Sequence, residues 1–146
     1  MALRAVLRVL CLAAALLPLG AGGARAAQIV VEVTGITSTK GHIRVSLFRE
    51  AGWLEDEARV TGAVVPASGP TVTVTLPDVP PGTYAIALIH DADDDGDMTY
   101  TFVGLPKEGF GFSNDVRPRL SAPDFAPAAF TLGPEGARLK IALVHF

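Results

Sequence analysis

The stretch that decides the fold runs from Thr83 to Asp97 and reads TYAIALIHDADDDGD. Its first half, Thr83 to His90, is apolar at both odd and even positions. A strand with two apolar faces is covered on both sides, so we expect it to be central in its sheet. Its second half places five of the chain's fifteen acidic residues within seven positions. Carboxylates at this density repel one another unless positive charge lies among them, which makes this loop the candidate functional site.

Other segments alternate between apolar and polar residues, the period of a half-buried strand. The predicted strands cover residues 28–33, 42–48, 60–65, 71–76, 128–132 and 137–146. Thr39-Lys40-Gly41 is interpreted as a hairpin turn between the first two strands, with Gly41 at positive φ. No stretch keeps a helical period. The pattern predicts an all-β fold: one antiparallel Ig-like β-sandwich of about seven strands, with a long acidic and Gly-aromatic loop.

Several side chains have expected positions in such a sandwich. Trp53 lies in an irregular segment and is expected to fold back over the edge of the core. The hydroxyl of Tyr84, after Pro-Pro-Gly-Thr, is expected to bond back to the backbone of the preceding loop, as at a corner in Ig-like domains. His42 and Arg44 alternate with apolar residues and are predicted to face solvent.

The N-terminus has the pattern of an export signal, residues 1–26, with two early arginines, an apolar core at 9–17 and an Ala-x-Ala site ending at Ala26. The apolar core is too short to span a bilayer, so we expect no transmembrane segment in the mature chain. Residues 27–146 then form a single domain, periplasmic or secreted. Removing residues 1–26 takes away the only cysteine and three arginines, so the net charge goes from −3 to −6. That charge argues against nucleic acid and anionic membrane as partners.

The acidic loop matches the first half of a calcium-binding EF-hand loop. Asp91, Asp93 and Asp95 alternate and Gly96 and Asp97 follow, so the side chains converge while glycine makes the bend. A true EF-hand is rejected because its twelfth position, which requires glutamate, is Phe102, and neither flank is helical. We therefore predict a calcium site without the EF-hand helices.

The remaining oxygen ligands would come from farther along the chain. Glu108 and Asn114 are the candidates included with the four aspartates, and Asp115 is a further one. Calcium favours such an all-oxygen set, although His90 leaves zinc or manganese open. The alternative is that the loop is a solvated, aspartate-rich turn with no metal.

A family resemblance rests on several motifs: Pro-Gly-Thr-Tyr-Ala at 81–85, His-Asp at 90–91, the Asp/Gly loop, Gly-Leu-Pro-Lys-Glu at 104–108, Gly-Phe-Gly-Phe-Ser-Asn at 109–114, and Pro123 through Phe130. In these the chain resembles domain-of-unknown-function family 2141, small bacterial exported proteins. In that family asparagine is common where Asp93 and Asp95 stand, and both residue types can ligate calcium. The resemblance implies an Ig-like β fold and an extracytoplasmic location, and it implies no particular activity.

Two functions compete on the sequence alone. The first is a non-enzymatic, calcium-stabilised domain that binds an unknown protein or glycan partner in the cell envelope, with Phe110 and Phe112 either forming its recognition surface or packing in the core. The second is a metal-assisted hydrolase that uses His90 and Glu108 as acid and base. The chain has no G-x-S-x-G, H-E-x-x-H or P-loop motif. We therefore favour the first and assign no catalytic residue.

Overall fold

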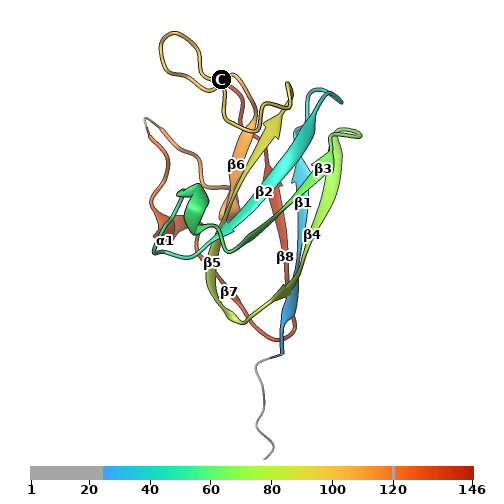
Figure 1. Ribbon diagram of the computed structural model, residues 1–146, viewed down its shortest axis with the longest axis vertical. Helices are drawn as coiled ribbons and strands as arrows, with labels where there is room; N and C mark the ends of the chain where they lie inside the picture. Colours follow the sequence, from blue (N-terminus) through green and yellow to red (C-terminus); the bar gives the residue numbers. More distant parts are fainter. Residues whose placement is uncertain (1–24, 120) are drawn as a thin grey trace, which may run out of the picture.

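Figure 1 shows the computed structural model, which describes residues 25–119 and 121–146. Over these residues the chain is built mainly from strands, as predicted. The eight strands are β1 (Ala27–Thr34), β2 (His42–Phe48), β3 (Thr61–Pro66), β4 (Thr71–Val79), β5 (Gly82–Asp91), β6 (Phe110–Phe112), β7 (Phe130–Leu132) and β8 (Ala137–Ala142). The helical elements are single turns: η1 (Asp56–Ala58), η2 (Ser113–Asp115) and α1 (Phe125–Ala128).

Two predictions about the N-terminal region and the membrane have different outcomes. The predicted export signal falls on residues 1–26, and residues 1–24 lie outside the described part, so this signal stays a prediction. None of the helices in the described ranges has the length and apolar character needed to cross a bilayer.

The strands form two sheets. One has the order β4-β1-β8, and the other has the order β3-β2-β5-β6, with β7 also paired to β5. Among the described strands every pairing is antiparallel except one, β1 with β8, which run parallel from Ile29 opposite Ala137 to Thr34 opposite Ala142. The prediction of a purely antiparallel fold is therefore wrong at this pair. The reason is that β7 belongs to the five-stranded sheet, so the chain crosses between sheets before β8 joins β1.

The segment before β2 is not a hairpin. Because β1 and β2 belong to different sheets, Thr39-Lys40-Gly41 carries the chain from one sheet to the other. The positive φ predicted for Gly41 is confirmed at 67°. The structure gives a second reason for glycine here, which the sequence does not reveal: a Cβ on Gly41 would overlap the carbonyl oxygen of Asp91. This turn thus packs directly against the start of the acidic loop.

The main core lies between the two sheets, and β5 supplies side chains to both of its own sides. Tyr84, Ile86 and Leu88 join the main core with residues of β1, β2, β4 and β8. The alternate residues, Ala85 and its neighbours along the strand, join a second apolar cluster on the opposite face. With β2 on one edge and β6 and β7 on the other, the predicted central position of β5 is confirmed.

The second cluster is aromatic. Phe110 and Phe112 are only 6% and 8% exposed and pack within 6.0 Å of each other, centroid to centroid. Trp53 covers Phe112 and Phe125 and donates its indole N–H to the Pro123 carbonyl at 2.8 Å. The expected position of Trp53 over the core edge is confirmed. The two phenylalanines lie in this buried cluster, so the alternative in which they form a recognition surface is wrong. The short strand β6 was also missed, because it lies inside a segment that was predicted to be a loop.

Candidate functional site

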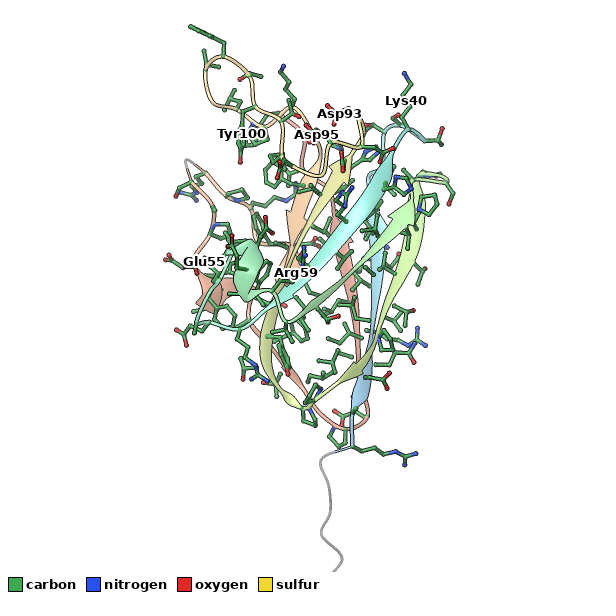
Figure 2. All side chains as sticks on the ribbon, viewed as in Figure 1. Lys40, Glu55, Arg59, Asp93, Asp95 and Tyr100 are labelled. Carbon is green, nitrogen blue, oxygen red and sulfur yellow. The ribbon has the colours of Figure 1, made fainter. Side chains whose placement is uncertain are left out.

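The acidic loop begins where β5 ends. Figure 2 shows Asp93, Asp95 and Lys40 together at the upper end of the molecule, where the acidic loop meets the turn between β1 and β2. The contact between these segments is specific, because the Nε2 of His90 lies 2.8 Å from the Lys40 carbonyl oxygen. The two sheets and the turn therefore fix the position of the loop on the fold.

Asp91 anchors the loop. Its side chain is fully buried and accepts a hydrogen bond from the Nε of Arg44 at 2.5 Å. It also accepts from the backbone N–H groups of Asp95 at 3.2 Å and Gly96 at 3.0 Å. Burial raises the pKa of Asp91, but Arg44 and the two backbone donors together outweigh burial, so its pKa lies below the ordinary value of 3.8. Asp91 is therefore a charged carboxylate built into the fold.

The density of carboxylates predicted a nearby positive charge, and the structure shows that Arg44 supplies it. We predicted that Arg44 faces solvent, but its side chain is only 33% exposed and reaches Asp91 from β2. His42, also predicted to face solvent, places Nδ1 2.5 Å from the Oδ1 of Asp94. The signal that could have found both is strand pairing, because His42 lies opposite Asp91 when β2 and β5 pair.

Three carboxylates converge at this loop. Asp91, Asp93 and Asp95 each offer an oxygen, and these oxygens lie within 4.8 Å of one another. Hydrogen bonds inside the loop hold the aspartates: the backbone N–H of Asp95 donates to Asp93 and that of Asp97 donates to Asp95. The alternate aspartate side chains therefore converge as their spacing predicted, and the bound ion stays a prediction.

The bend between the aspartates needs glycine. Gly96 has a φ of 88°, in the left-handed region that favours glycine. An added Cβ would meet no atom within 4 Å, so the backbone conformation alone explains the residue. The role predicted for Gly96 from the EF-hand half-loop agrees with this conformation.

Glu108 braces the loop through its backbone. One carboxylate oxygen accepts from the N–H of Ala92 at 3.0 Å and the other from the N–H of Thr99 at 3.1 Å. The side chain is buried at 8% exposure. Glu108 thus ties the two ends of the acidic loop together, which the sequence did not reveal, and it is not one of the three converging carboxylates.

The other two predicted ligands are not brought into the cluster. The carboxylate of Asp97 lies outside the converging group, although its backbone belongs to the loop. Asn114 is at the far end of the neighbouring strand and donates to the carbonyls of Pro127 and Ala129. The prediction that Asn114 is a ligand is therefore wrong. Residue 112 pairs with residue 87, so the chain leaves β6 moving away from Asp91. Asp115, also suggested, accepts from the N–H of Ala142.

The chemistry open to this arrangement is the binding of a hard cation. Hard divalent cations prefer oxygen ligands, and calcium takes six to eight of them. Asp93 and Asp95 are exposed, so water can complete the coordination around their oxygens. Among the described residues, the group of converging ligand atoms consists of carboxylates and includes neither His42 nor His90. The donor set therefore fits calcium better than zinc.

Comparison with known proteins identifies the family and nothing closer. Residues 31–140 match the family described as "Uncharacterized protein conserved in bacteria (DUF2141)". The match covers most of the chain, and the chain belongs to this family. Separate comparisons with curated proteins and with solved structures find no match.

Proposed function

We propose that this member of the family is an exported, non-enzymatic domain with an Ig-like sandwich fold, stabilised by calcium at the acidic loop and acting as a binding module in the cell envelope. The observation that carries the proposal is the convergence of Asp91, Asp93 and Asp95 to within 4.8 Å. Three like charges that close raise the energy of the fold unless a cation joins them. Among the described residues, the ion pair of Arg44 is with Asp91, so the charges of Asp93 and Asp95 remain for a ligand.

The Ig-like assignment is supported by the corner at the start of β5. The Tyr84 hydroxyl donates to the carbonyl of Pro80 at 2.8 Å, four residues upstream. A tyrosine bonded back to the preceding loop is a recurrent feature of Ig-like sandwiches. Two sheets that share one core favour the same assignment, while the parallel pairing of β1 and β8 is a departure from a purely antiparallel sandwich.

A binding role is favoured over a hydrolase because the candidate acid and base are already engaged. Both oxygens of Glu108 accept backbone N–H groups, and the Nε2 of His90 contacts a backbone carbonyl at 3% residue exposure. A general base must reach the proton that it removes. Both candidate side chains are held by backbone groups in this structure, which favours a binding role over acid–base catalysis.

Calcium titration tests the metal proposal. We expect the exported protein, stripped of metal, to release or absorb heat on titration with calcium. Calcium at a hundredfold excess over its Kd adds about 2.7 kcal/mol to the unfolding free energy, roughly 10 °C in Tm. The variant Asp93→Asn/Asp95→Asn keeps two side-chain oxygens but removes two negative charges, so both effects should become much weaker at the same calcium concentration. The matched control Asp56→Asn/Glu57→Gln changes the same charge on η1, where both residues are exposed, and should keep both.

The outcomes separate the alternatives. An absence of heat together with an unchanged Tm overturns the calcium proposal and leaves a solvated turn. Equal calcium effects in the two double variants would show that bulk charge, not the loop, binds the ion. Hydrolysis of ester, phosphate or glycoside substrates that depends on Asp93 and Asp95 would overturn the non-enzymatic part.

A further inference from the structure

A hairpin beside the acidic loop exposes its apolar side chains. Phe102 and Val103 at the apex are 106% and 76% exposed, and Tyr100 and Leu105 behind them are 57% and 46% exposed. Residues 98–106 carry no charge in a chain that is otherwise acidic. Figure 1 shows this segment as a narrow loop that extends from the upper end of the molecule, and Figure 2 places Tyr100 at its base. These four exposed apolar side chains do not pack in the core, so folding of the domain does not explain them.

The hairpin has a defined backbone. Tyr100 and Pro106 form an antiparallel bridge, and the N–H of Lys107 donates to the Thr99 carbonyl at 2.8 Å. Nearer the apex, Thr101 is the hub: its N–H donates to the Leu105 carbonyl, and its hydroxyl and carbonyl oxygens accept from Leu105 and Gly104. Pro106 has no N–H to satisfy. Internal pairing lowers the cost of moving this backbone out of water, which is the requirement for entering lipid.

The residues are ordered along the hairpin as at a lipid–water interface. The apex is purely apolar, and Tyr100 and Lys107 follow toward the base, where a phenol and an ammonium can remain in the headgroup layer. We propose that the tip, residues 100–106, inserts into the interfacial layer of a zwitterionic lipid bilayer. This inference rests on the proposed function, since it names the envelope surface that the binding module contacts.

Charge selects the lipid. Asp93, Asp94 and Asp95 lie next to the hairpin and are exposed, so an anionic headgroup would be repelled. A zwitterionic headgroup has no net charge and permits insertion with or without calcium. A calcium ion on the acidic loop removes part of the repulsion, so binding to anionic lipid should require calcium.

Size argues against a second copy of the chain as the occupant. A stable interface covers about 800 Å² on each partner. Four side chains at the end of one hairpin offer much less than this, because a whole large aromatic side chain contributes only about 150–250 Å². A convex apolar tip is therefore better matched to a fluid surface than to a flat copy of itself.

Vesicle sedimentation tests the proposal with the exported protein and phosphatidylcholine–phosphatidylethanolamine vesicles in EDTA. The variant Phe102→Ser/Val103→Ser should lower the partition coefficient about tenfold or more. The control Val60→Ser/Val64→Ser removes two other exposed valines around β3 and should change it less than about twofold. Both double variants should keep the wild-type Tm. In Phe102→Trp, the added indole should emit at shorter wavelength when vesicles are present, against the constant background of Trp53.

Three results would overturn the proposal: wild-type binding no stronger than that of the tip variant, an equal loss in the control, or a wild-type dimer that the tip substitutions dissociate. In the last case a second copy is the occupant. Repeating the assay with phosphatidylglycerol vesicles, with and without calcium, separates the two proposals. Zwitterionic binding with no calcium effect on anionic vesicles and no calcium heat would sink the metal proposal alone. Calcium heat without any vesicle binding would sink the lipid proposal alone.

Discussion

Strand β5 holds a buried polar group at each end, and each is joined to an arginine. At its start the Tyr84 hydroxyl accepts from Arg49 at 2.9 Å, and the guanidinium of Arg49 lies over the ring at 4.7 Å from the centroid. At its end Asp91 pairs with Arg44. Because β2 runs antiparallel to β5, two arginines five residues apart reach opposite ends of the same strand. The two anchors are alike in construction.

The difference lies in what surrounds each anchor. At the start, the tyrosine hydroxyl has one donor, Arg49, and one acceptor, the Pro80 carbonyl. At the end, Asp93 and Asp95 add charge that the anchor does not neutralise. The difference teaches that two roles can be told apart: Asp91 holds the loop through its buried contacts, and its exposed neighbours add the charge that is available to the proposed cation.

Breaking the anchor at the end of β5 should have the largest effect. Arg44→Met removes the side-chain partner of a fully buried carboxylate, which should lower the unfolding free energy by about 3 kcal/mol. Urea denaturation of the metal-free protein measures this loss. Arg59→Met, which removes an exposed pair with Asp56 at 4.0 Å, is the control and should stay within about 0.5 kcal/mol. Equal losses would mean that the buried pair has no special role.

Breaking the anchor at the start should have a smaller effect. Tyr84→Phe deletes the two hydrogen bonds of the hydroxyl while keeping the buried ring, so the expected loss is about 1–2 kcal/mol. Tyr100→Phe, at an exposed ring, should leave the unfolding free energy unchanged. Tyr84→Phe should also keep any calcium heat that the wild type shows, because the start of β5 contributes no residue to the proposed cation site.

Lowering the pH should weaken the stabilisation from the Asp91 anchor and leave that from the Tyr84 anchor unchanged. The pKa of Asp91 is lower in the folded protein than its ordinary value of 3.8, so ionised Asp91 stabilises the fold above that value. The contribution falls as the pH drops through the lower, native pKa. In EDTA, the difference in unfolding free energy between wild type and Arg44→Met should shrink as the pH falls below about 4. The difference for Tyr84→Phe should stay constant, because no carboxylate takes part in its hydrogen bonds. A constant Arg44→Met difference would contradict the origin given for the pKa shift.

Much of the fold was readable because burial imposes alternation. Ile29, Val31 and Val33 alternate along β1 and are fully buried, and the doubly apolar β5 is central. Strand β6 was unreadable because its three residues, Phe-Gly-Phe, are too few to establish a period. The parallel pairing of β1 with β8 was unreadable for another reason: alternation reports which face is buried, not which strand lies alongside.

The site was predictable where local sequence determines it. Alternate aspartates and Gly96 lie within one loop, so their convergence needs no tertiary information. Arg44 and Glu108 act across the sheet and across the hairpin, and their roles depend on pairings that the sequence does not state. The prediction for Asn114 failed for the same reason. Asn114 is close to Glu108 in sequence, but β6 lies between them and carries the chain away from the acidic loop.

The smallest predicted effect is the sharpest test of the comparison. If Asp93 and Asp95 serve only a ligand, Asp93→Asn/Asp95→Asn should not weaken the metal-free fold. Relief of repulsion should instead raise its unfolding free energy by about 0.5 kcal/mol at low salt, and this gain should shrink at about 1 M salt. Both aspartates also accept backbone N–H groups through side-chain oxygens, and asparagine retains an oxygen for that role.

A loss of stability in EDTA would place Asp93 and Asp95 with Asp91 as structural residues and remove the distinction between anchor and ligand. The control Asp56→Asn/Glu57→Gln should show no comparable gain, because these charges on η1 do not converge with the acidic loop. Added calcium should reverse the order of stability, with the wild type becoming more stable than its double variant. Only a cation bound by these two carboxylates explains that reversal, since a purely electrostatic or purely structural role would leave the order unchanged.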